Sequence, residues 1–471
     1  MPAYDRSRLT PGIVHIGLGN FHRAHQAVYL DDLFARGLGH DWAILGAGVR
    51  AGDATMRDAL VAQDCLSTVI ELDPKGHKAR RIGAMTGFIP VQPDNAALIA
   101  AMADPAIRIV SLTVTEGGYF VDPATGRFDP AAPEIVADAA TPDRPVTAFG
   151  AILAALRLRR ANGTRPFTVM SCDNLPGNGH VTQDAVAGLA ELSDPKLADW
   201  VRSTVAFPNG MVDRITPATG PRERALAVSF GLDDPVPVTC EPFRQWVLED
   251  DFPMGRPPLE QVGVTFTPHV HAYEAMKIRI LNGGHAIIAY PGGLMDIELV
   301  HEAMAHPLIA GFLHRVETDE IIPFVPAVPD VNLADYFALI HDRFANPEIA
   351  DTVRRLCLDG SNRQPKFILP SLRDNLAAGT LPKGLILESA LWCRYCAGVS
   401  DSGAVIAPND PNWDRLTAVA KAARNDPSRW LAMEDIYGVT GRDPAVIAAF
   451  SDALNDLWAR GTKAVLTDYI S

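Results

Sequence analysis

The stretch Gly12-Ile-Val-His-Ile-Gly17-Leu-Gly19-Asn-Phe-His22-Arg-Ala-His25 decides the fold of the first half of the chain. An apolar run leads into a Gly-X-Gly turn, and a helical pattern follows. In a dinucleotide-binding fold the first glycine permits the tight turn, the second lets a pyrophosphate approach, and the helix start offers free N–H groups. His22 stands where the usual third glycine would be, so the fingerprint is incomplete. The strand-turn-helix context nevertheless favours a cofactor loop over a plain turn, with these residues as candidates: Gly17, Gly19, Asn20 and Phe21.

Short β-branched runs alternate with amphipathic stretches from Gly12 to about Pro268. Strands separated by helices predict a parallel sheet with helices on both faces. Two helices have a glycine just past their end, Phe21 to Arg36 and Thr147 to Asn162. The strand candidates are Ile13 to Ile16, Trp42 to Val49, Leu66 to Leu72, Ile107 to Val114, Phe167 to Cys172 and Val264 to Thr267.

The strand signal fades after Tyr273, and apolar residues then recur at spacings of three and four. This pattern predicts a mostly helical second half. The clearest helices are Leu333 to Arg343, Leu385 to Cys396, Arg415 to Ala423 and Pro444 to Arg460.

The composition is that of a soluble globular protein. The chain has 471 residues, which allows two or three domains, and 48% of them are hydrophobic. Its net charge is 42 − 56 = −14, which disfavours binding to nucleic acid or to an anionic membrane surface. Six dispersed cysteines indicate a reducing compartment, and no signal peptide or membrane span is visible. We therefore expect a cytoplasmic protein.

Asp53 follows the second strand candidate. In a dinucleotide fold an acid at this place hydrogen-bonds a ribose 2′-hydroxyl and repels a 2′-phosphate, which favours NAD. The alternative is an acid that caps the helix from Ala54. Arg50 and Arg57 flank it and leave room for a phosphate.

Two further loops follow apolar strands, where open parallel sheets bind ligands. The first contains Thr115 and Glu116 in front of Gly117-Gly118. The second, Ser171-Cys-Asp-Asn174-Leu-Pro-Gly-Asn-Gly179, has amides that can donate into an active site. Its alternative reading is an ordinary Asn/Gly/Pro turn.

The densest segment is Tyr273-Glu274-Ala-Met-Lys277-Ile-Arg-Ile-Leu-Asn282-Gly-Gly-His285. On an ideal helix Lys277 and His285 lie within about 80° of each other, whereas Asn282 is about 140° from Lys277. Asn282 shares their face only if the Gly-Gly pair distorts the helix. Apolar neighbours invite burial of Lys277, which lowers the pKa of an ammonium toward neutrality and suits an acid/base. The alternative is a lysine whose stem lies on the core and whose charge reaches water.

Other chemistries are poorly supported. Cys393 and Cys396 have zinc-ligand spacing but lie in a helical pattern without a second pair, and no further metal ligand can be placed in the sequence beside His269-Val-His271. Tyr273 and Lys277 match the Tyr-X-X-X-Lys pair of short-chain dehydrogenases, whose proteins are about half this length. The chain has no Gly-X-Ser-X-Gly elbow and no P-loop.

Taken together, the motifs resemble the polyol-specific long-chain dehydrogenase family, which includes mannitol 2-dehydrogenases, arabinitol dehydrogenases and fructuronate and tagaturonate reductases. The resemblance covers nearly the whole chain. It implies an α/β protein with an N-terminal Rossmann-type domain, residues 1–273, and a mainly α-helical C-terminal domain, residues 274–471. The matching segments are Ile13 to His25, Thr115 to Tyr119, Ser171 to Pro176, Asn209 to Pro217, Glu241 to Glu249 and the Lys277 segment.

The resemblance also implies roles for single residues. Lys277 matches the general acid/base, Asn174 and Asn282 match two asparagines that orient the oxyanion, and His285 matches a partner of the substrate hydroxyls. Asp213 and Glu274 match carboxylates near the lysine, whose charge holds the lysine pKa up against burial.

Arg355 matches a family arginine, and Arg363 stands where the family often has lysine. Arginine keeps the positive charge of lysine at this position but not its hydrogen-bonding geometry. Lys366, three residues on, is an alternative for the same role.

The resulting expectation is an NAD-dependent, metal-independent enzyme that interconverts a sugar alcohol and its 2-ketose, first of all D-mannitol and D-fructose. A monomer or small homo-oligomer is expected, with a small polyol as its partner. Alternatives are a hexuronate reductase, an arabinitol or other polyol dehydrogenase, and a silent dinucleotide-binding protein.

Overall fold

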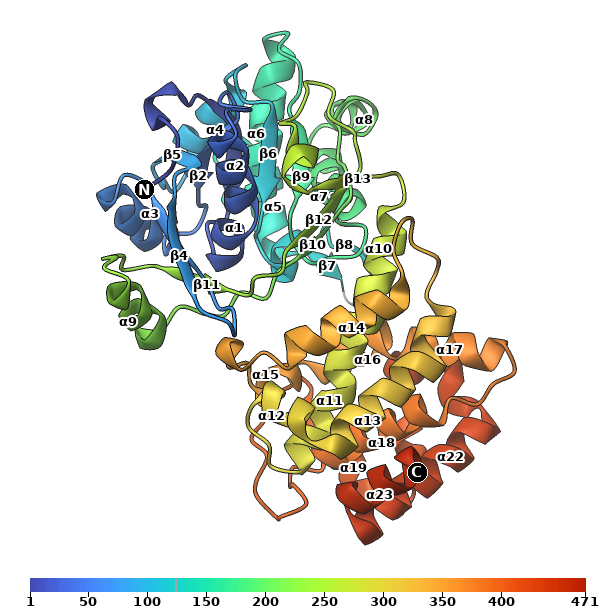
Figure 1. Cartoon of the computed structure of the whole chain (residues 1–471). Coiled ribbons are helices and arrows are strands. Elements are labelled where there is room, and N and C mark those ends of the chain that lie inside the picture. The colour runs from blue at the N-terminus through green and yellow to red at the C-terminus, as the bar shows by residue number, and fades with distance from the viewer. Residues whose placement is uncertain (123–124) are drawn as a thin grey trace. The chain divides into compact units, whose positions relative to one another are not determined.

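The computed structural model describes residues 1–122 and 125–471, and the chain forms two compact units (Figure 1). The first unit comprises Met1–His271 and the second Ala272–Ser471.

The first unit is built on a five-stranded sheet in which every pairing is parallel. Its order is β5-β2-β1-β6-β9, so the chain starts in the middle, moves to one edge and returns to the other side of β1. The direction reverses between β1 and β6, which is where doubly wound sheets bind ligands. The strands are β1 (Pro11–Ile16), β2 (Ala43–Ala47), β5 (Met85–Phe88), β6 (Ile109–Leu112) and β9 (Thr168–Ser171).

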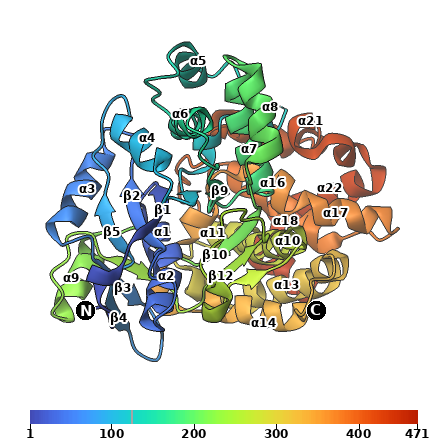
Figure 2. The same ribbon diagram turned by 90° about the horizontal axis from the view of Figure 1, so that it is seen from above.

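Both faces of this sheet are buried because successive side chains point to opposite sides. Val14 of β1 belongs to one hydrophobic core and Ile13 to the other. Figure 2 shows α4 and α6 on one side of β1 and β2 and α2 on the other. The predicted parallel sheet with helices on both faces is confirmed.

Of the two helices predicted in the first unit, the one from Thr147 is confirmed and the one from Phe21 is interrupted. Thr147 caps α6 by accepting from the Gly150 N–H, as the predicted helix start requires. The helix expected over Phe21 to Arg36 is instead broken at His25, whose φ of −119° and ψ of −89° are not helical. The helices are α1 (Asn20–Ala24), α2 (Gln26–Ala35), α3 (Asp53–Ala62), α4 (Ala96–Ala103), α5 (Pro133–Ala140), α6 (Ala148–Ala161), α7 (Asn178–Glu191), α8 (Pro195–Thr204) and α9 (Pro221–Ser229).

Within the described residues, three smaller sheets complete the first unit. The strand predicted over Leu66 to Leu72 exists, but it pairs with β4 and β11 and lies outside the central sheet. The smaller sheets consist of β3 (Ser67–Glu71), β4 (Lys78–Ile82) and β11 (Val238–Cys240); β10 (Gly210–Asp213), β12 (Gln245–Leu248) and β13 (Thr265–Phe266); and β7 (Val121–Asp122) with β8 (Arg127–Phe128).

The second unit is helical, as the sequence predicts (yellow to red in Figure 1). The helix α10 (Val270–Met276), which belongs to this unit from Ala272 on, continues into a π-helix, η4 (Lys277–Asn282), and then into α11 (Gly283–Leu294). The π-helix η5 (Glu317–Ile321) packs against η4. The other main helices are α12 (Val300–Ala305), α13 (Pro307–Val316), α14 (Leu333–Phe344), α15 (Val353–Leu356), α16 (Gly360–Phe367), α17 (Leu369–Ala377), α18 (Lys383–Cys396), α19 (Trp413–Ala423), α20 (Ser428–Leu431), α21 (Glu434–Tyr437), α22 (Pro444–Arg460) and α23 (Thr462–Ile470).

Among the residues that the structure describes, no helix has the length and hydropathy that crossing a membrane requires.

Candidate active site

The Gly-X-Gly turn follows β1, and its two glycines have different surroundings. Gly17 has a φ of +100°, and a Cβ built on it would lie 2.1 Å from the carbonyl oxygen of Thr113, so only glycine fits. Gly19 is exposed, and a Cβ there would meet no atom of the described residues within 4 Å. The turn therefore needs Gly17 for its own conformation and leaves open space at Gly19, as the approach of a diphosphate requires.

His22 fills the third-glycine position with a fully buried imidazole. Its ring stacks on that of His15 in β1, with centroids 3.5 Å apart and planes inclined by 18°. His15 is held by the hydroxyl of Ser111, 2.7 Å from its Nδ1. Burial lowers the pKa of His15 to about 3 and the pKa of His22 well below its usual value, so both rings are neutral. The helix and the strand thus pack through two stacked rings where the usual fingerprint has a glycine.

Two polar side chains fix the start of α1. Asn20 Nδ2 donates to the carbonyl of Pro217, at 3.0 Å, and to the hydroxyl of Thr219, at 2.9 Å. Arg23 is buried and donates to Asn20 Oδ1 at 2.8 Å and to the carbonyl of Gly19 at 3.4 Å. The amide of Asn20 therefore holds the turn in place, and a positive charge lies buried directly behind that turn.

Asp53 is the first residue of α3 and closes the turn that follows β2. Its Oδ2 accepts from the backbone N–H groups of Val49, at 3.0 Å, and Arg50, at 2.9 Å. These donors precede the helix, so Asp53 braces the loop instead of capping the helix, whose N-cap is Gly52. Both bonds go to Oδ2, and no donor among the described residues reaches Oδ1.

The segment after β6 contains Thr115 and Glu116, both exposed. Thr115 has φ +66° and ψ 162°, a conformation that is essentially restricted to glycine and costs on the order of 1–3 kcal/mol. Behind it, the carboxylate of Asp173 accepts from the N–H groups of Val114, at 2.8 Å, and Thr115, at 3.0 Å. The hydroxyl of Tyr119 also donates to Asp173, at 2.7 Å. Burial raises the pKa of Asp173.

Asn174 is exposed in the turn between β9 and α7. The buried side chain of Asn178 ties this turn to β10: its Nδ2 donates to the carbonyls of Asp173, at 3.1 Å, and Gly210, at 2.8 Å. Its Oδ1 accepts from the N–H of Gly210 at 2.9 Å. The segment that carries Asn174 is thereby joined to the strand that ends at Asp213.

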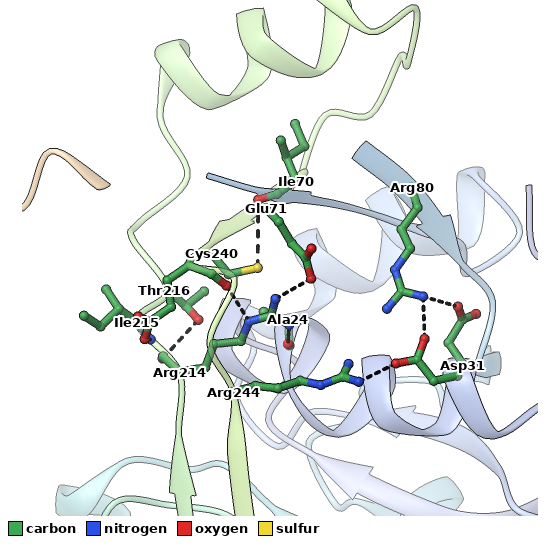
Figure 3. Close-up of polar contacts among 12 residues, drawn as sticks. Ala24, Asp31, Ile70, Glu71, Arg80, Arg214, Ile215, Thr216, Cys240 and Arg244 are labelled. Atoms are coloured by element: carbon green, nitrogen blue, oxygen red, sulfur yellow. Dashed lines mark hydrogen bonds and ion pairs between the residues drawn. The ribbon is translucent and has the colours of Figure 1, made fainter. Parts of the chain in front are cut away.

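Asp213 is the last residue of β10 and is buried opposite Gln245 of β12. The next residue, Arg214, is held by three hydrogen bonds. Its guanidinium donates to the Glu71 carboxylate at 2.7 Å and to the carbonyl of Ala24 at 2.6 Å (Figure 3). It also donates to the carbonyl of Glu241 at 3.0 Å. Arg214 thus joins the end of β10 to β3 and to the end of α1.

His25 connects α1 with β12 in the same region. Its Nε2 donates to the carbonyl of Gln245 at 2.9 Å, and its ring stacks on that of half-buried Phe21, with centroids 4.9 Å apart. Burial lowers the pKa of His25 to about 3. Phe21 is therefore held by His25, and the neutral imidazole is a structural element of the motif.

In the second unit, the π-helix η4 begins at Lys277 and ends at Asn282, both buried. A π-helix closes its hydrogen bonds from i to i+5, so residues five apart lie one turn apart on the same face. Glu274 precedes Lys277 by three residues and His285 follows Asn282 by three, which is one α-helical turn in each case. The four side chains therefore follow one face. The distortion that the sequence required is present, but it precedes the Gly-Gly pair.

Tyr273 has a structural partner in the second unit. Its hydroxyl donates to the carbonyl of Pro329 at 2.9 Å. The pairing with Lys277 known from short-chain dehydrogenases therefore gains no support from its environment.

His285 is half-buried and stacks on Phe344 of α14, with ring centroids 4.4 Å apart and planes inclined by 25°. Burial and the positive charges of Arg355, Arg343, Arg363 and Lys277 hold the pKa of His285 well below its usual value. The imidazole is thus neutral in an electropositive environment. Sequence reasoning missed Arg343, which is buried at the end of α14 and has no motif of its own.

The three candidate cations of the segment near α15 and α16 differ in their surroundings. Arg355 is exposed and forms a two-pronged ion pair with Asp351, whose Oδ1 lies 2.5 Å from its Nε. Arg363 is half-buried and donates to the carbonyl of Leu356 at 3.2 Å. Lys366 is exposed and is not among the charges that lower the pKa of His285 most. The electrostatic environment of His285 favours Arg363 over Lys366 as the second cation.

An unusual acid lies behind this helix. Glu317 of η5 is fully buried, and neither carboxyl oxygen has a hydrogen-bond partner in the described part of the chain. A Cβ built on Gly284 would lie 3.2 Å from Glu317 Oε1 and 3.2 Å from the ring of Phe344. Burial raises the pKa of Glu317 well above its usual value, which favours the protonated form.

No group of three or more His, Cys, Asp or Glu side chains with metal-binding geometry occurs within residues 1–122 and 125–471. Cys393 and Cys396 are buried in α18, and burial raises the pKa of both thiols.

Comparison with known proteins identifies both parts of the chain. Residues 11–261 match the mannitol dehydrogenase Rossmann domain, and residues 269–458 match the mannitol dehydrogenase C-terminal domain. A mannitol 2-dehydrogenase of Cereibacter sphaeroides is 73% identical over 100% of this chain and 98% of its own length. A mannitol 2-dehydrogenase of Aspergillus clavatus is 42% identical over 100% of this chain and 95% of its own.

Two solved structures have the same fold. The ternary complex of Pseudomonas fluorescens mannitol 2-dehydrogenase with NAD and D-mannitol is 42% identical, covers 100% of this chain and 96% of its own, and superposes with a TM-score of 0.89. A substrate-free D-sorbitol dehydrogenase is 35% identical, covers 99% and 96%, and gives a TM-score of 0.92. The chain therefore belongs to the mannitol dehydrogenase family, contains both of its domains and is an oxidoreductase.

Proposed function

We propose that the protein oxidises D-mannitol to D-fructose with NAD and catalyses the reverse reduction. The observation that carries this proposal is the 73% identity to the Cereibacter sphaeroides mannitol 2-dehydrogenase over the whole chain. The Pseudomonas fluorescens relative, which was solved with NAD and D-mannitol, supports the same pair of ligands.

NAD is the cofactor, and the first unit supplies the groups that hold it. The backbone of Gly17 and Gly19 and the first turn of α1, with Asn20 and Phe21, form the diphosphate loop. Asp53 offers its Oδ1 to the ribose, and Thr115 and Glu116 line the neighbouring loop. When bound, NAD accepts the hydride that leaves the alcohol carbon.

Lys277 is the general base that takes the hydroxyl proton in oxidation and the acid that returns it in reduction. Its burial and its place on one face with Glu274, Asn282 and His285 support this role. The carboxylates of Glu274 and Asp213 tune the lysine, because a nearby negative charge favours its protonated form.

Asn174 and Asn282 donate to the oxygen on which negative charge develops. Amides suit this task because they donate without competing for the proton, and loss of one such donor costs about 3 kcal/mol of barrier. His285 contacts a substrate hydroxyl. Its low pKa keeps the ring neutral, so one ring nitrogen can accept and the other can donate. Arg355 and Arg363 bind further oxygens of the substrate.

A hexuronate reductase is the second candidate. The observation in its favour is the positive environment of His285, to which Arg343, Arg355 and Arg363 contribute. Such a cluster can also hold a sugar carboxylate.

The test is a substrate panel followed by NADH absorbance, with mannitol, glucitol, arabinitol, fructose and fructuronate. We expect the highest kcat/KM with mannitol and fructose. Turnover with fructuronate alone would reject the mannitol assignment, and failure of every substrate would leave a silent dinucleotide-binding protein. The mechanism uses no metal, so activity should persist in excess EDTA.

Residues 1–273 are proposed to bind the dinucleotide and residues 274–471 to supply the base. A cytoplasmic location and a monomeric or small homo-oligomeric state stay predictions from composition and resemblance.

A further inference from the structure

One buried carboxylate, that of Asp173, connects two loops of the first unit that carry proposed site residues. It accepts from the N–H groups of Val114, at 2.8 Å, and Thr115, at 3.0 Å, and from the hydroxyl of Tyr119, at 2.7 Å. All three donors belong to the segment that follows β6, whereas Asp173 itself follows β9. Asn174 and Thr115 are exposed, so the carboxylate lies behind the groups that face a ligand.

Thr115 is the residue for which this connection matters most. Its φ of +66° and ψ of 162° belong to a region that side chains other than glycine rarely enter. A residue keeps such a conformation only when its surroundings impose it. The bonds from Asp173 fix the two peptide groups that directly precede the strained residue.

The main chain of Asp173 is fixed as well. Its N–H donates to the hydroxyl of Ser171 at 3.3 Å, and its carbonyl accepts from Asn178 Nδ2 at 3.1 Å. Asn174 therefore starts from an anchored residue. A change at Asp173 disturbs the Thr115 loop through the side chain and the Asn174 turn through the backbone.

We propose that Asp173 is a positioning residue that holds Thr115 in its strained conformation and sets the start of the Asn174 turn. The inference rests on the proposed function, because it assumes that Thr115 serves the cofactor and Asn174 the substrate oxygen. One carboxylate then aligns the cofactor loop with a catalytic amide.

A double-mutant cycle tests the proposal. Asp173→Asn keeps the volume but turns an amide NH₂ toward a backbone N–H, and Thr115→Gly removes the need to hold the strained backbone. We expect D173N to raise KM for NAD at least tenfold in the wild-type background and less than threefold in the T115G background. The loss of kcat should persist in both, since glycine at position 115 does not restore the Asn174 turn.

Asp138 provides the matched control. It is a buried carboxylate of α5 that accepts from the N–H groups of Val146, at 2.7 Å, and Thr147, at 3.1 Å, and from the Thr147 hydroxyl at 2.5 Å. D138N should lower the thermal midpoint as D173N does but change KM for NAD less than twofold. An equal effect of D173N in both backgrounds, or a D138N effect on KM as large as that of D173N, overturns the proposal.

If D173N does not fold, two single variants at Thr115 still test the proposal. T115A and T115G both remove the threonine side chain beyond Cβ, but only glycine relieves the backbone. T115G should have the higher thermal midpoint, and the reverse order contradicts the strain on which the proposal depends. Wild-type enzyme without turnover refutes the proposed function instead, whereas active wild type with the wrong variant pattern refutes only the role of Asp173.

Discussion

Lys277 offers the most specific prediction for a single side chain. Lys277→Ala removes the proposed base, so kcat should fall by roughly 10²- to 10⁴-fold, the usual contribution of general acid/base catalysis. The Kd for NADH, measured by fluorescence titration, should change less than threefold. Lys421→Ala, which removes an exposed lysine of α19, is the control and should leave both quantities unchanged. Loss of NADH binding in K277A would identify the lysine as structural or as a phosphate ligand.

Two single substitutions distinguish whether Arg363 or Lys366 contacts the substrate. Arg363 is among the charges that lower the pKa of His285 most, and exposed Lys366 is not. Arg363→Gln should therefore raise KM for D-mannitol about tenfold, as expected when a charged hydrogen bond is lost. Lys366→Gln should stay within twofold of wild type in the same steady-state assay. The opposite order would assign the substrate contact to Lys366.

Single site residues could be predicted where their position in the sequence, just after a predicted strand, identifies them. Gly17 and Gly19 stand in the turn that the strand-helix pattern predicts, and Asp53 follows β2 as expected. Arg343 was not predictable, because it reaches the environment of His285 only through packing of α14. The stacking of the His15 and His22 imidazoles could not be predicted from the sequence either, because their contact depends on how closely α1 approaches β1.

At the scale of elements, the π-helix η4 explains an apparent misfit of the sequence. With 3.6 residues per turn, Asn282 lies about 140° from Lys277, and the Gly-Gly pair is the obvious place for a distortion. The structure has the extra residue between Lys277 and Asn282 instead. The spacing of three, five and three residues from Glu274 to His285 was the available signal, because only a π-turn keeps such a series on one face.

The two glycines that follow η4 predict opposite outcomes. A Cβ at Gly283 would meet its nearest atoms at 3.4 and 3.6 Å, so Gly283→Ala should fit and raise the free energy of unfolding by about 0.5–1 kcal/mol. Gly284→Ala crowds Glu317 and Phe344, both at 3.2 Å, and should lower it by about 1–3 kcal/mol. Urea unfolding compares the two, and equal effects would contradict the packing described behind η4. Because Phe344 stacks on His285, G284A should also raise KM for mannitol.

Elements with weak local signals were missed. β5 has only four residues, Met-Thr-Gly-Phe, and β4 is the charged run Lys-Ala-Arg-Arg-Ile, so neither shows a β-branched pattern. Long amphipathic helices such as α6 and α22 were predicted almost to the residue, because period and caps agree.

At the scale of the whole molecule, buried neutral histidines make the free energy of unfolding decrease as the pH becomes acidic. The folded pKa of His22 is well below its unfolded value of about 6.5, so the unfolded chain binds a proton that the folded chain does not. The contribution of neutral His22 to the free energy of unfolding is complete above pH 6.5. It decreases by about 1.4 kcal/mol per pH unit as the pH falls below that value. The wild-type advantage in unfolding free energy over His22→Gln should shrink with this slope between pH 6.5 and 5. A pH-independent difference would mean that His22 is not neutral when folded.

In the second unit, Glu388 makes a contribution to the free energy of unfolding that has the opposite pH dependence. It is fully buried, accepts from Gln364 Nε2 at 2.5 Å, and burial raises its pKa to about 8. Its contribution is complete below the unfolded value of about 4.5 and is lost as pH rises toward 8. Relative to Glu388→Gln, wild type should lose about 1.4 kcal/mol per pH unit over this range, measured by urea unfolding. No relative loss would place an ionised carboxylate at this position.

The extra residue in η4 has a consequence for other genomes. A π-turn is a helix that holds one residue more than its hydrogen-bond ladder needs, so a single deletion restores an ordinary α-helix. In a related gene, loss of one codon between the lysine and the asparagine would leave the two side chains four residues apart on an ordinary α-helix, about 40° from each other and still on one face. The side chains after the asparagine would keep their direction, because the wider π-turn had absorbed the rotation of the residue that is lost. A one-residue gap in this interval of an alignment is therefore no evidence against the proposed activity, whereas a one-residue gap elsewhere in the helix would rotate the later side chains by about 100°.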